Sequence, residues 1–407
     1  MRCALIGQTL AHSYSKTIHE KFGFYGYDLV ELQPNELNDF VRGETYDAFN
    51  VTMPYKTQII ACLDKTDEVA SETGAVNTVV RLGGKTYGYN TDAFGMAYML
   101  KRGGISLAGK NVLIAGSGGT GKTAAYVAKK MKAAKITVVS RKGEVNYANV
   151  YEQDDVQVII NATPVGMYPY TDVSLLDVKR FPRLEAVADV IYNPMKTRLV
   201  LDAEKEGIKA IGGLSMLVAQ AKFSMDAFTK KRHDDALIGK TLTALEREIR
   251  NVVLIGMPGS GKTSVGKAVA KRLMKRYADS DAVIAEKAGC PIPEIFEKYG
   301  EKYFRSLEKQ ALAELGRKHG TVISTGGGAV LDPENYYSIA QNGRIYYLER
   351  AAEELATRGR PLSKDKQALS EMEKTRLPLY EKYADVTVEN DGDFFACVKK
   401  ITEDFLK

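Results

Sequence analysis

Short apolar segments alternate with longer segments of helical periodicity along most of the chain. Strand-like runs lie at 111–115, 136–140, 156–160, 187–191, 251–255, 321–324 and 344–348. This alternation predicts an α/β architecture, because parallel strands joined by helices are buried on both faces and therefore read as continuous apolar runs. Residues 234–250 have the pattern of a helix that ends just before the strand at 251, so we expect a very short linker at that point.

Two of the predicted strands run directly into glycine-rich turns that are followed by helical patterns. The turns begin at Gly116 and Gly256, and the segments around them do not match each other. We therefore expect two different nucleotide-binding domains rather than a duplication. The length of 407 residues agrees with two or three domains.

The composition narrows the class of protein. Hydrophobic residues make up 44% and charged residues 27%, which is typical of a globular protein. The net charge of +6 is spread without a long basic run, so we expect small anionic substrates and no nucleic-acid partner. The four cysteines are far apart, which argues against a disulfide framework or a zinc site and indicates a cytoplasmic location. No run approaches the roughly 18 apolar residues of a membrane span. We expect no membrane partner, and the oligomeric state is left open.

The first glycine turn, GSGGTGKT at 116–123, fits two phosphate-binding patterns. It matches G-x-G-x-x-G of dinucleotide sites and G-x-x-x-x-G-K-T of nucleoside triphosphate sites, and these eight residues leave both open. The next strand ends at Ser140, Arg141 and Lys142, without the carboxylate that binds the ribose of NAD. Arg141 and Lys142 can also be read as ordinary surface charges. Taken with the turn, however, the basic pair favours the 2′-phosphate of NADP.

Several polar motifs in the N-terminal part carry a more specific signal. They are HSYS at 12–15, NVTMPYK at 50–56, GAVNT at 74–78 and NTDAFG at 90–95. Singly, each has an ordinary interpretation as helix caps, turn residues or surface charge. In this order, and with NATPVGM at 161–167, DVIYNP at 189–194 and GLSMLVAQ at 213–220, they make residues 1–248 resemble the shikimate dehydrogenase family.

That resemblance implies a set of site residues. Lys56 and Asp92 would be the catalytic pair, and an ammonium held by a carboxylate suits the oxyanion that grows when a hydride reduces a ketone. The substrate carboxylate would be bound by Ser13 and Ser15. Its hydroxyls would be bound by Thr52, Asn77, Asp92 and Gln220, with Tyr192 and Met216 lining the site. The NADP residues would be Gly116, Gly118, Gly119, Ser140, Arg141, Lys142, Gly213 and Met216.

Two positions depart from the family pattern. Lys16 stands where the family usually has proline, which either loosens that turn or adds a positive charge near the carboxylate. Gly121, Lys122 and Thr123 stand where the family usually has small residues, which keeps a second ATP site open as an interpretation. Nothing between 124 and 250 resembles the partner motifs of an ATP site, so we predict that this turn binds NADPH.

The second glycine turn, GMPGSGKT at 256–263, is a complete Walker A pattern between a predicted strand and a predicted helix. Its backbone N–H groups would cradle the phosphates of ATP, Lys262 would neutralise the β- and γ-oxygens, and Thr263 would bind Mg²⁺. The predicted ATP residues are Gly256, Gly259, Ser260, Gly261, Lys262, Thr263 and Ser264.

Downstream motifs make residues 249–407 resemble shikimate kinase: DSD at 279–281, GEKYFRSLE at 300–308, STGGG at 324–328, RPL at 360–362 and RLPLY at 376–380. The resemblance implies that Asp279 helps to hold Mg²⁺ and that Asp281 accepts the proton of the attacking hydroxyl. Arg305, oriented by Glu308, and Arg376 would bind the substrate carboxylate. Arg360 would lie in a lid and reach the transferring phosphoryl group, and Gly326, Gly327 and Gly328 would let the backbone approach the substrate ring. The segment 349–362 is short for the lid of this family.

Together these features predict an α/β chain of three domains. An α/β substrate domain would comprise 1–97 plus 213–248, a Rossmann NADP domain 98–212, and a P-loop kinase domain of the adenylate-kinase-like, parallel α/β type 249–407. The expected reactions are reduction of 3-dehydroshikimate to shikimate with NADPH, and phosphorylation of shikimate with ATP and Mg²⁺. The alternatives are that the first half acts on quinate with NAD, or that one domain senses nucleotide without turnover. The basic pair and both serines favour shikimate and NADP, and the retained catalytic residues favour turnover.

Overall fold

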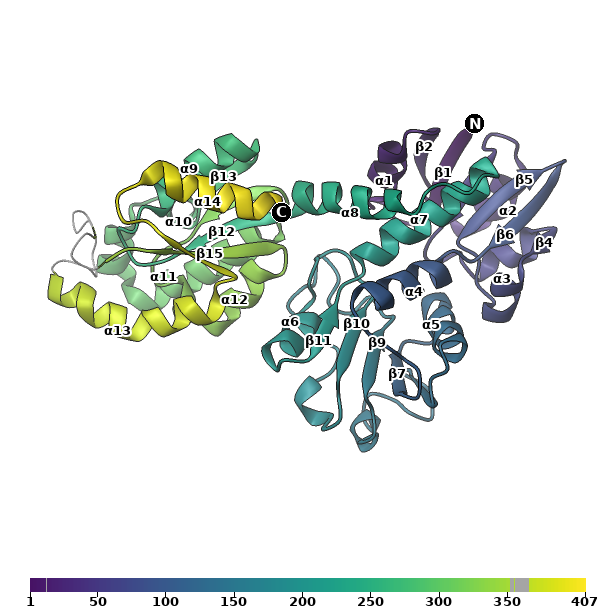
Figure 1. Cartoon of the computed structure of the whole chain (residues 1–407), viewed down its shortest axis with the longest axis horizontal. Helices are drawn as coiled ribbons and strands as arrows, with labels where there is room; N and C mark the ends of the chain where they lie inside the picture. The colour runs from purple at the N-terminus through teal and green to yellow at the C-terminus, as the bar shows by residue number, and fades with distance from the viewer. Residues whose placement is uncertain (12, 352–354, 356–365) are drawn as a thin grey trace. The chain divides into compact units, whose positions relative to one another are not determined.

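The computed structural model describes all residues except 12, 352–354 and 356–365, and the side chains of 366–370 are likewise left undescribed. The chain forms two compact units, Met1–Leu245 and Glu246–Lys407, which are coloured purple to teal and teal to yellow in Figure 1. Arg360 and most of the predicted lid lie outside the described residues. The three domain boundaries predicted from the sequence stay a prediction.

The first unit opens with a mixed sheet in the order β2-β1-β3-β5-β6-β4. Its strands are β1 (Arg2–Gly7), β2 (Gly26–Glu31), β3 (Ala48–Val51), β4 (Lys65–Thr66), β5 (Thr78–Leu82) and β6 (Lys85–Tyr89). The strand β5 is antiparallel to β3 and to β6, in contrast to an all-parallel sheet. The reason lies at Gly83 and Gly84, which join β5 to β6 with φ of 58° and 74° and so form a two-residue hairpin turn.

A second sheet in the same unit is parallel throughout, in the order β11-β10-β9-β7-β8. Its strands are β7 (Asn111–Ala115), β8 (Lys135–Val139), β9 (Val158–Asn161), β10 (Ala186–Asp189) and β11 (Lys209–Ile211). The predicted strands agree with these within two residues. Five helices of the unit are α1 (Ser15–Phe22), α2 (Leu37–Arg42), α3 (Glu68–Thr73), α5 (Gly119–Lys130) and α6 (Arg198–Lys205).

Two further helices, α4 (Asp92–Arg102) and α7 (Leu214–Thr229), lie side by side in the first unit (Figure 1). Met96 and Met99 of α4 pack with Met216 of α7 and with Val112 of β7 in one buried apolar cluster. Because Asp92 begins α4 and Gln220 lies in α7, this packing brings predicted site residues from distant parts of the chain to one place.

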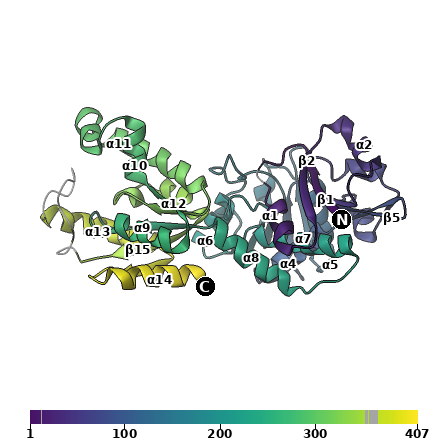
Figure 2. The same cartoon turned by 90° about the horizontal axis from the view of Figure 1, so that it is seen from above.

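The second unit contains a parallel sheet in the order β13-β14-β12-β15-β16. Its strands are β12 (Asn251–Ile255), β13 (Arg276–Asp279), β14 (Thr321–Ser324), β15 (Gly343–Glu349) and β16 (Val386–Glu389). The helices α9 (Lys262–Leu273) and α14 (Phe394–Leu406) cover one face, and α11 (Ile292–Arg317) and α12 (Pro333–Ala340) cover the other (Figures 1 and 2). Helices α10 (Ser280–Ala288) and α13 (Lys366–Tyr383) complete the unit.

Helix α8 (Ala236–Ile249) precedes β12 almost directly, in agreement with the helix predicted at 234–250. Among the described residues, no helix is long and apolar enough to cross a membrane. The predicted α/β class is confirmed for both units.

Candidate active sites

Lys56 and Asp92 form an ion pair in the first unit. Lys56 Nζ donates to Asp92 Oδ2 at 2.6 Å, and the exposed fractions of the two side chains are 18% and 8%. Lys56 follows β3, whereas Asp92 is the first residue of α4. Two motifs that are separate in the sequence therefore supply one partly buried ion pair.

Asn77 fixes the other oxygen of this carboxylate. Its Nδ2 donates to Asp92 Oδ1 at 2.9 Å and to Gln220 Oε1 at 3.3 Å, while its Oδ1 accepts from the Thr91 backbone N–H at 2.7 Å. The structure thus brings Lys56, Asp92, Asn77 and Gln220 together, as the resemblance implied. Asn77 itself is 3% exposed, and its amide is largely occupied by protein partners.

Behind Asn77 lies a group of buried hydroxyls that the sequence analysis missed. Thr78, Thr91 and Ser224 have mutual O···O distances of 2.8 to 3.1 Å, and Asn50 Nδ2 donates to Thr78 and Ser224. Thr78 and Thr91 stand inside motifs quoted for the family, which was an available signal. Ser224 gave none, because it comes from α7, far away in the sequence.

The two serines expected to bind a carboxylate lie at the start of α1. The Ser15 backbone N–H donates to Ser13 Oγ at 3.2 Å, and the Ser13 side chain opposes the rise in the pKa of Tyr192 that burial causes. Burial raises the pKa of Tyr192, so its hydroxyl stays protonated and keeps its hydrogen.

Lys16, which departs from the family pattern, is half-exposed and lies 3.8 Å from Glu20 along α1. Thr52 follows β3 directly, and its N–H donates to the backbone of β1.

The first glycine turn is tight. Helix α5 begins at Gly119, and Gly116 has a φ of 106°. A Cβ on Gly121 would lie 2.0 Å from the Gly116 carbonyl oxygen, so the helix packs directly on the turn. A Cβ on Gly118 would meet nothing within 4 Å, which leaves the N-terminal N–H groups of α5 open to a phosphate. These features fit the diphosphate of a dinucleotide.

Thr123 shows that this turn differs from a triphosphate loop. Its hydroxyl donates to the Gly119 carbonyl and accepts from Asn90 Nδ2, both at 3.0 Å, and the residue is 1% exposed. A threonine used in this way is not placed to bind a metal. The expectation that the turn serves a dinucleotide agrees with this geometry.

The remaining predicted NADP residues fall into two groups. Arg141 and Lys142 are exposed directly after β8, with Ser140 partly buried before them. Gly213 precedes α7, and its N–H donates to the Ile191 carbonyl. Met216 is 6% exposed within the apolar core, so a role for its side chain in binding the cofactor stays a prediction.

The second glycine turn has the same sequence pattern but a different backbone. Gly256, Gly259 and Gly261 all have positive φ, and α9 begins only at Lys262, three residues later in the pattern than α5. Lys262 Nζ donates to the carbonyl oxygens of Gly256 and Met257 at 2.8 Å. The loop is therefore long enough to surround a phosphate, as a Walker A loop requires.

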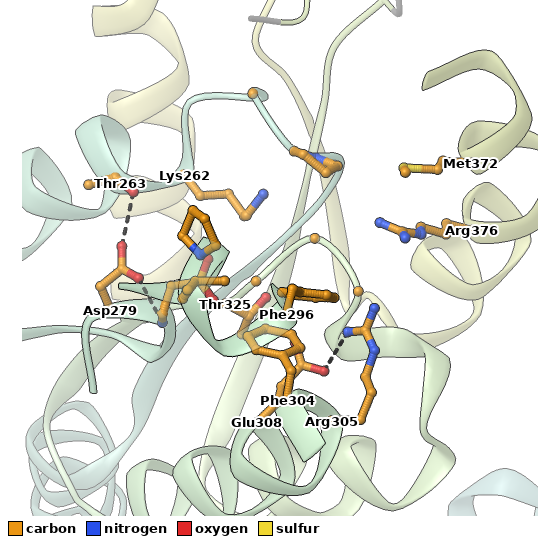
Figure 3. Close-up of a pocket in the computed structure, with 18 of the residues that line it drawn as sticks. Lys262, Thr263, Asp279, Phe296, Phe304, Arg305, Glu308, Thr325, Met372 and Arg376 are labelled. Atoms are coloured by element: carbon orange, nitrogen blue, oxygen red, sulfur yellow. Dashed lines mark hydrogen bonds and ion pairs between the residues drawn. The ribbon is translucent and has the colours of Figure 1, made fainter. Parts of the chain in front are cut away.

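Thr263 and Asp279, the two predicted metal ligands, lie together. Thr263 Oγ1 donates to Asp279 Oδ2 at 3.0 Å, as the dashed line in Figure 3 shows. One hydroxyl and one carboxylate fit Mg²⁺, which usually takes one or two protein oxygens and completes its shell with phosphates and water. Among the described residues there is no cluster of three His, Cys, Asp or Glu side chains of the kind that holds a metal alone.

A cavity of about 420 Å³ contains most of the predicted kinase residues. Its lining includes the glycine turn, Asp281, Arg305 and Arg376, and Figure 3 labels Lys262 of the turn together with both arginines. Gly256 and Ser260 are not part of its lining, and Ser260 instead lies buried with its carbonyl accepting from Asn390 Nδ2 at 2.6 Å. The analysis of the sequence missed one group of lining residues, whose apolar patterns read as ordinary core: Ile292, Pro293, Phe296, Phe304 and Met372.

Asp281, Arg305 and Glu308 form the charged floor of this cavity. Arg305 Nη1 donates to Glu308 Oε2 at 2.7 Å, so Glu308 orients the guanidinium as expected. Burial raises the pKa of Asp281, and the neighbouring Asp279 raises it further. Burial also raises the pKa of Glu308, although Arg305 opposes that shift.

The glycine triplet at 326–328 gives these side chains room. A Cβ on Gly328 would lie 2.2 Å from Arg305 Nη1, and a Cβ on Gly326 would lie 2.7 Å from Asp281 Oδ1. The expectation was that the triplet admits the substrate ring. The structure gives a different reason for these glycines: the side chains of Arg305 and Asp281 approach them too closely for a Cβ.

Comparison with known proteins agrees with this geometry. Residues 5–79 match the model of the shikimate dehydrogenase substrate binding domain. A shikimate dehydrogenase (NADP(+)) of Methanococcus maripaludis is 32% identical over 266 residues, which cover 59% of this chain and 95% of that protein. The chain belongs to the shikimate dehydrogenase family. Residues 258–405 of the same chain match the model of shikimate kinase.

Solved structures resemble the dehydrogenase unit. A chorismate mutase/shikimate 5-dehydrogenase fusion protein from Clostridium acetobutylicum has a TM-score of 0.57 and 32% identity, and the match covers 60% of this chain and 97% of that one. The shikimate 5-dehydrogenase of Thermus thermophilus, in complex with NADP(H) and shikimate, has a TM-score of 0.54 and 28% identity over 60% and 99% of the two chains. The Clostridium protein also joins a shikimate dehydrogenase to a second enzyme in one chain.

Proposed function

We propose that the chain catalyses two consecutive reactions: NADPH-dependent reduction of 3-dehydroshikimate to shikimate, and ATP-dependent phosphorylation of the 3-hydroxyl of shikimate. The observation that carries the proposal is that each unit collects the charged residues of one family at one place. Lys56, Asp92 and Asn77 meet in the first unit, and Lys262, Asp281 and Arg305 line one cavity in the second.

In the dehydrogenase unit, the ion pair of Lys56 and Asp92 supplies the proton that the reduced substrate needs. NADPH, when bound at the first glycine turn, supplies the hydride. Asp92 holds the Lys56 ammonium 2.6 Å away, where its N–H groups stabilise the growing oxyanion and deliver the proton that completes the hydroxyl. Asn77 keeps the other carboxylate oxygen occupied, so Asp92 is oriented from two sides. Ser13, Ser15 and Tyr192 bind the carboxylate at the opposite end of the substrate.

In the kinase unit, Arg305 and Arg376 bind the same carboxylate in the second reaction. Mg²⁺-ATP, when bound, supplies the phosphoryl group. Thr263 and Asp279 are the side chains that would hold the metal, and Lys262 neutralises the phosphate oxygens. Asp281 accepts the proton of the attacking hydroxyl. Its raised pKa makes this carboxylate a stronger base than an exposed aspartate.

The two reactions are chemically consecutive, because the ketone that the first reaction reduces becomes the hydroxyl that attacks the phosphoryl group in the second.

We also propose that both reactions occur in the cytoplasm, since all four cysteines are free thiols in the structure. We propose that residues 1–97 plus 213–248 bind the substrate of the first reaction, that 98–212 bind NADP and that 249–407 catalyse the second reaction. Arg360 is proposed to contribute to phosphoryl transfer.

One reaction tests the proposal. The full chain is given 3-dehydroshikimate, NADPH, ATP and Mg²⁺, and both products are quantified by mass spectrometry. We expect shikimate 3-phosphate from the intact chain, and accumulation of shikimate when Lys262 is replaced by methionine. Absence of shikimate would contradict the first activity, and shikimate without ester from the intact chain would contradict the second. Parallel assays with quinate and NAD⁺ test the alternative that the first half acts on quinate with NAD.

A further inference from the structure

Tyr14 makes a contact that links two separate sheets of the dehydrogenase unit. Its ring lies against the ring of Tyr192, with centroids 5.5 Å apart and planes tilted by 51°. Tyr14 stands between Ser13 and Ser15 in the connection from β1 to α1, and Tyr192 stands in the connection from β10 to α6. This geometry is typical of a favourable pair of aromatic side chains.

Both loops are held by hydrogen bonds of their own. On the Tyr14 side, the Tyr14 carbonyl accepts the first helical hydrogen bond of α1, from the Ile18 N–H, and the Ser13 N–H donates to the Leu10 carbonyl. The backbone on either side of the Tyr14 ring is thus held in place. The ring consequently has a defined position relative to the two serine hydroxyls.

On the Tyr192 side, the buried carboxylate of Asp189 anchors the loop. It accepts from the Ile191 N–H at 3.0 Å and from the Thr197 hydroxyl at 2.7 Å, which lie on either side of Tyr192. Asp189 is completely buried, so these bonds are shielded from water. The backbone on both sides of Tyr192 is therefore anchored to the end of β10.

The Ser13 side chain also acts on the hydroxyl of Tyr192, because it opposes the rise in the Tyr192 pKa that burial causes. A serine hydroxyl rotates freely about its Cα–Cβ bond, so this interaction alone is a weak constraint on how far apart the loops lie. The ring contact of Tyr14 adds a second constraint beside it.

We propose that Tyr14 is a positioning residue for the substrate: by packing on Tyr192 it holds the hydroxyls of Ser13 and Tyr192 at the spacing that the substrate carboxylate needs. This inference rests on the proposed dehydrogenase reaction. It adds a residue between the two serines whose role depends on its ring and not on a polar group. It also makes substrate affinity depend on a contact between the two sheets.

The test compares Tyr14→Leu with Tyr14→Phe in the full chain, by steady-state reduction of 3-dehydroshikimate. We expect Tyr14→Leu to raise the KM for 3-dehydroshikimate about 5-fold, which is within the range of a lost aromatic pair, with kcat and the KM for NADPH within about 2-fold. Tyr14→Phe keeps the ring and should restore the KM. Tyr170→Leu removes a tyrosine that is 75% exposed and serves as the matched control.

A second substrate tests whether the effect of Tyr14→Leu on KM arises at the substrate carboxylate. In the reverse reaction with NADP⁺, shikimate carries a charged carboxylate, whereas its methyl ester is neutral at the same position. We expect Tyr14→Leu to weaken the use of shikimate but to change the use of the ester by less than about 2-fold. An equal loss with both substrates, or a Tyr14→Leu enzyme with an unchanged KM, would overturn the proposal. An intact chain without reductase activity would instead contradict the proposed function itself, so the two failures are distinguishable.

Discussion

Lys56 and Asp92 stand 36 residues apart in the sequence, yet Lys56 Nζ lies 2.6 Å from Asp92 Oδ2. Neither side chain is more than one-fifth exposed, so the pair interacts in a medium that screens charge less than water does. Asp92 is further held by Asn77, which limits how the carboxylate can turn. The ammonium is therefore oriented before a substrate binds.

Replacing Lys56 by methionine is expected to lower kcat of the dehydrogenase by about 10²- to 10⁴-fold, since the proton donor and the charge beside the oxyanion are both lost. NADPH oxidation followed by absorbance measures this directly. Lys135→Met, which removes a half-exposed lysine paired with Asp155 at the start of β8, should leave the rate within about 2-fold. Unchanged binding of NADPH by the Lys56 variant would show that the first unit is folded. A loss of less than 10-fold would contradict the assigned role.

The two lysines of the glycine turns should respond differently to the same substitution. Lys262→Gln is expected to lower shikimate phosphorylation by about 10²-fold or more, because the buried Lys262 ammonium neutralises the phosphates. Lys122→Gln should leave that rate within about 2-fold, because the helix in the first turn begins three residues earlier in the pattern. ATP-dependent rates of both variants check this. Equal losses would mean that the first turn also serves ATP.

The kinase reaction should be unusually sensitive to acid. Burial and the neighbouring Asp279 raise the pKa of Asp281, so the free enzyme protonates this base at a pH above the ordinary aspartate value of about 3.9. Because only the deprotonated carboxylate accepts the proton, kcat/KM for shikimate should fall as pH decreases through the raised pKa. The pH profile of kcat/KM reports on the free enzyme. A midpoint at or below about 4 would contradict the raised pKa, and an Asp281→Asn enzyme with an unchanged rate would contradict the role of Asp281 as the base.

Gly328→Ala should weaken shikimate binding to the kinase unit. The added methyl group would lie 2.2 Å from Arg305 Nη1, so the guanidinium must leave its place beside Glu308. Loss of a charge-assisted contact with the carboxylate predicts an increase of about 10-fold or more in the KM for shikimate. The KM for ATP and the dehydrogenase rate are internal controls. An unchanged KM for shikimate would show that Arg305 does not bind this substrate from its observed position.

Lys222 offers a test of stability away from both sites. Its side chain is fully buried and lies 2.7 Å from Asp226 and 2.5 Å from Asp235, just before α8. Lys222→Met should lower the free energy of unfolding of the first unit by about 2–3 kcal/mol, less than for a wholly buried pair because Asp235 is half-exposed. Lys179→Met, at an exposed ion pair with Glu206 in the same unit, should cost less than about 1 kcal/mol. Urea unfolding of both variants provides the comparison.

The sequence by itself determined seven of the parallel strands, the class of each unit and the families to which they are similar. A buried parallel strand is an apolar run of fixed length, and motifs such as the Walker A pattern place special residues at fixed spacings. Both signals are local, so they can be read without knowing which segments meet. This is why β7, β12 and β14 were predicted with their observed bounds.

Tertiary structure decided what the local pattern left open. Gly121–Thr123 and Gly261–Thr263 have the same residues, yet Thr123 is bonded to Gly119 and Asn90, whereas Thr263 faces Asp279. The contact between Tyr14 and Tyr192, the hydroxyls around Ser224 and the apolar lining near Phe296 also joined segments far apart in the chain. Such contacts depend on which side chains packing brings together, and spacing along the sequence does not encode that.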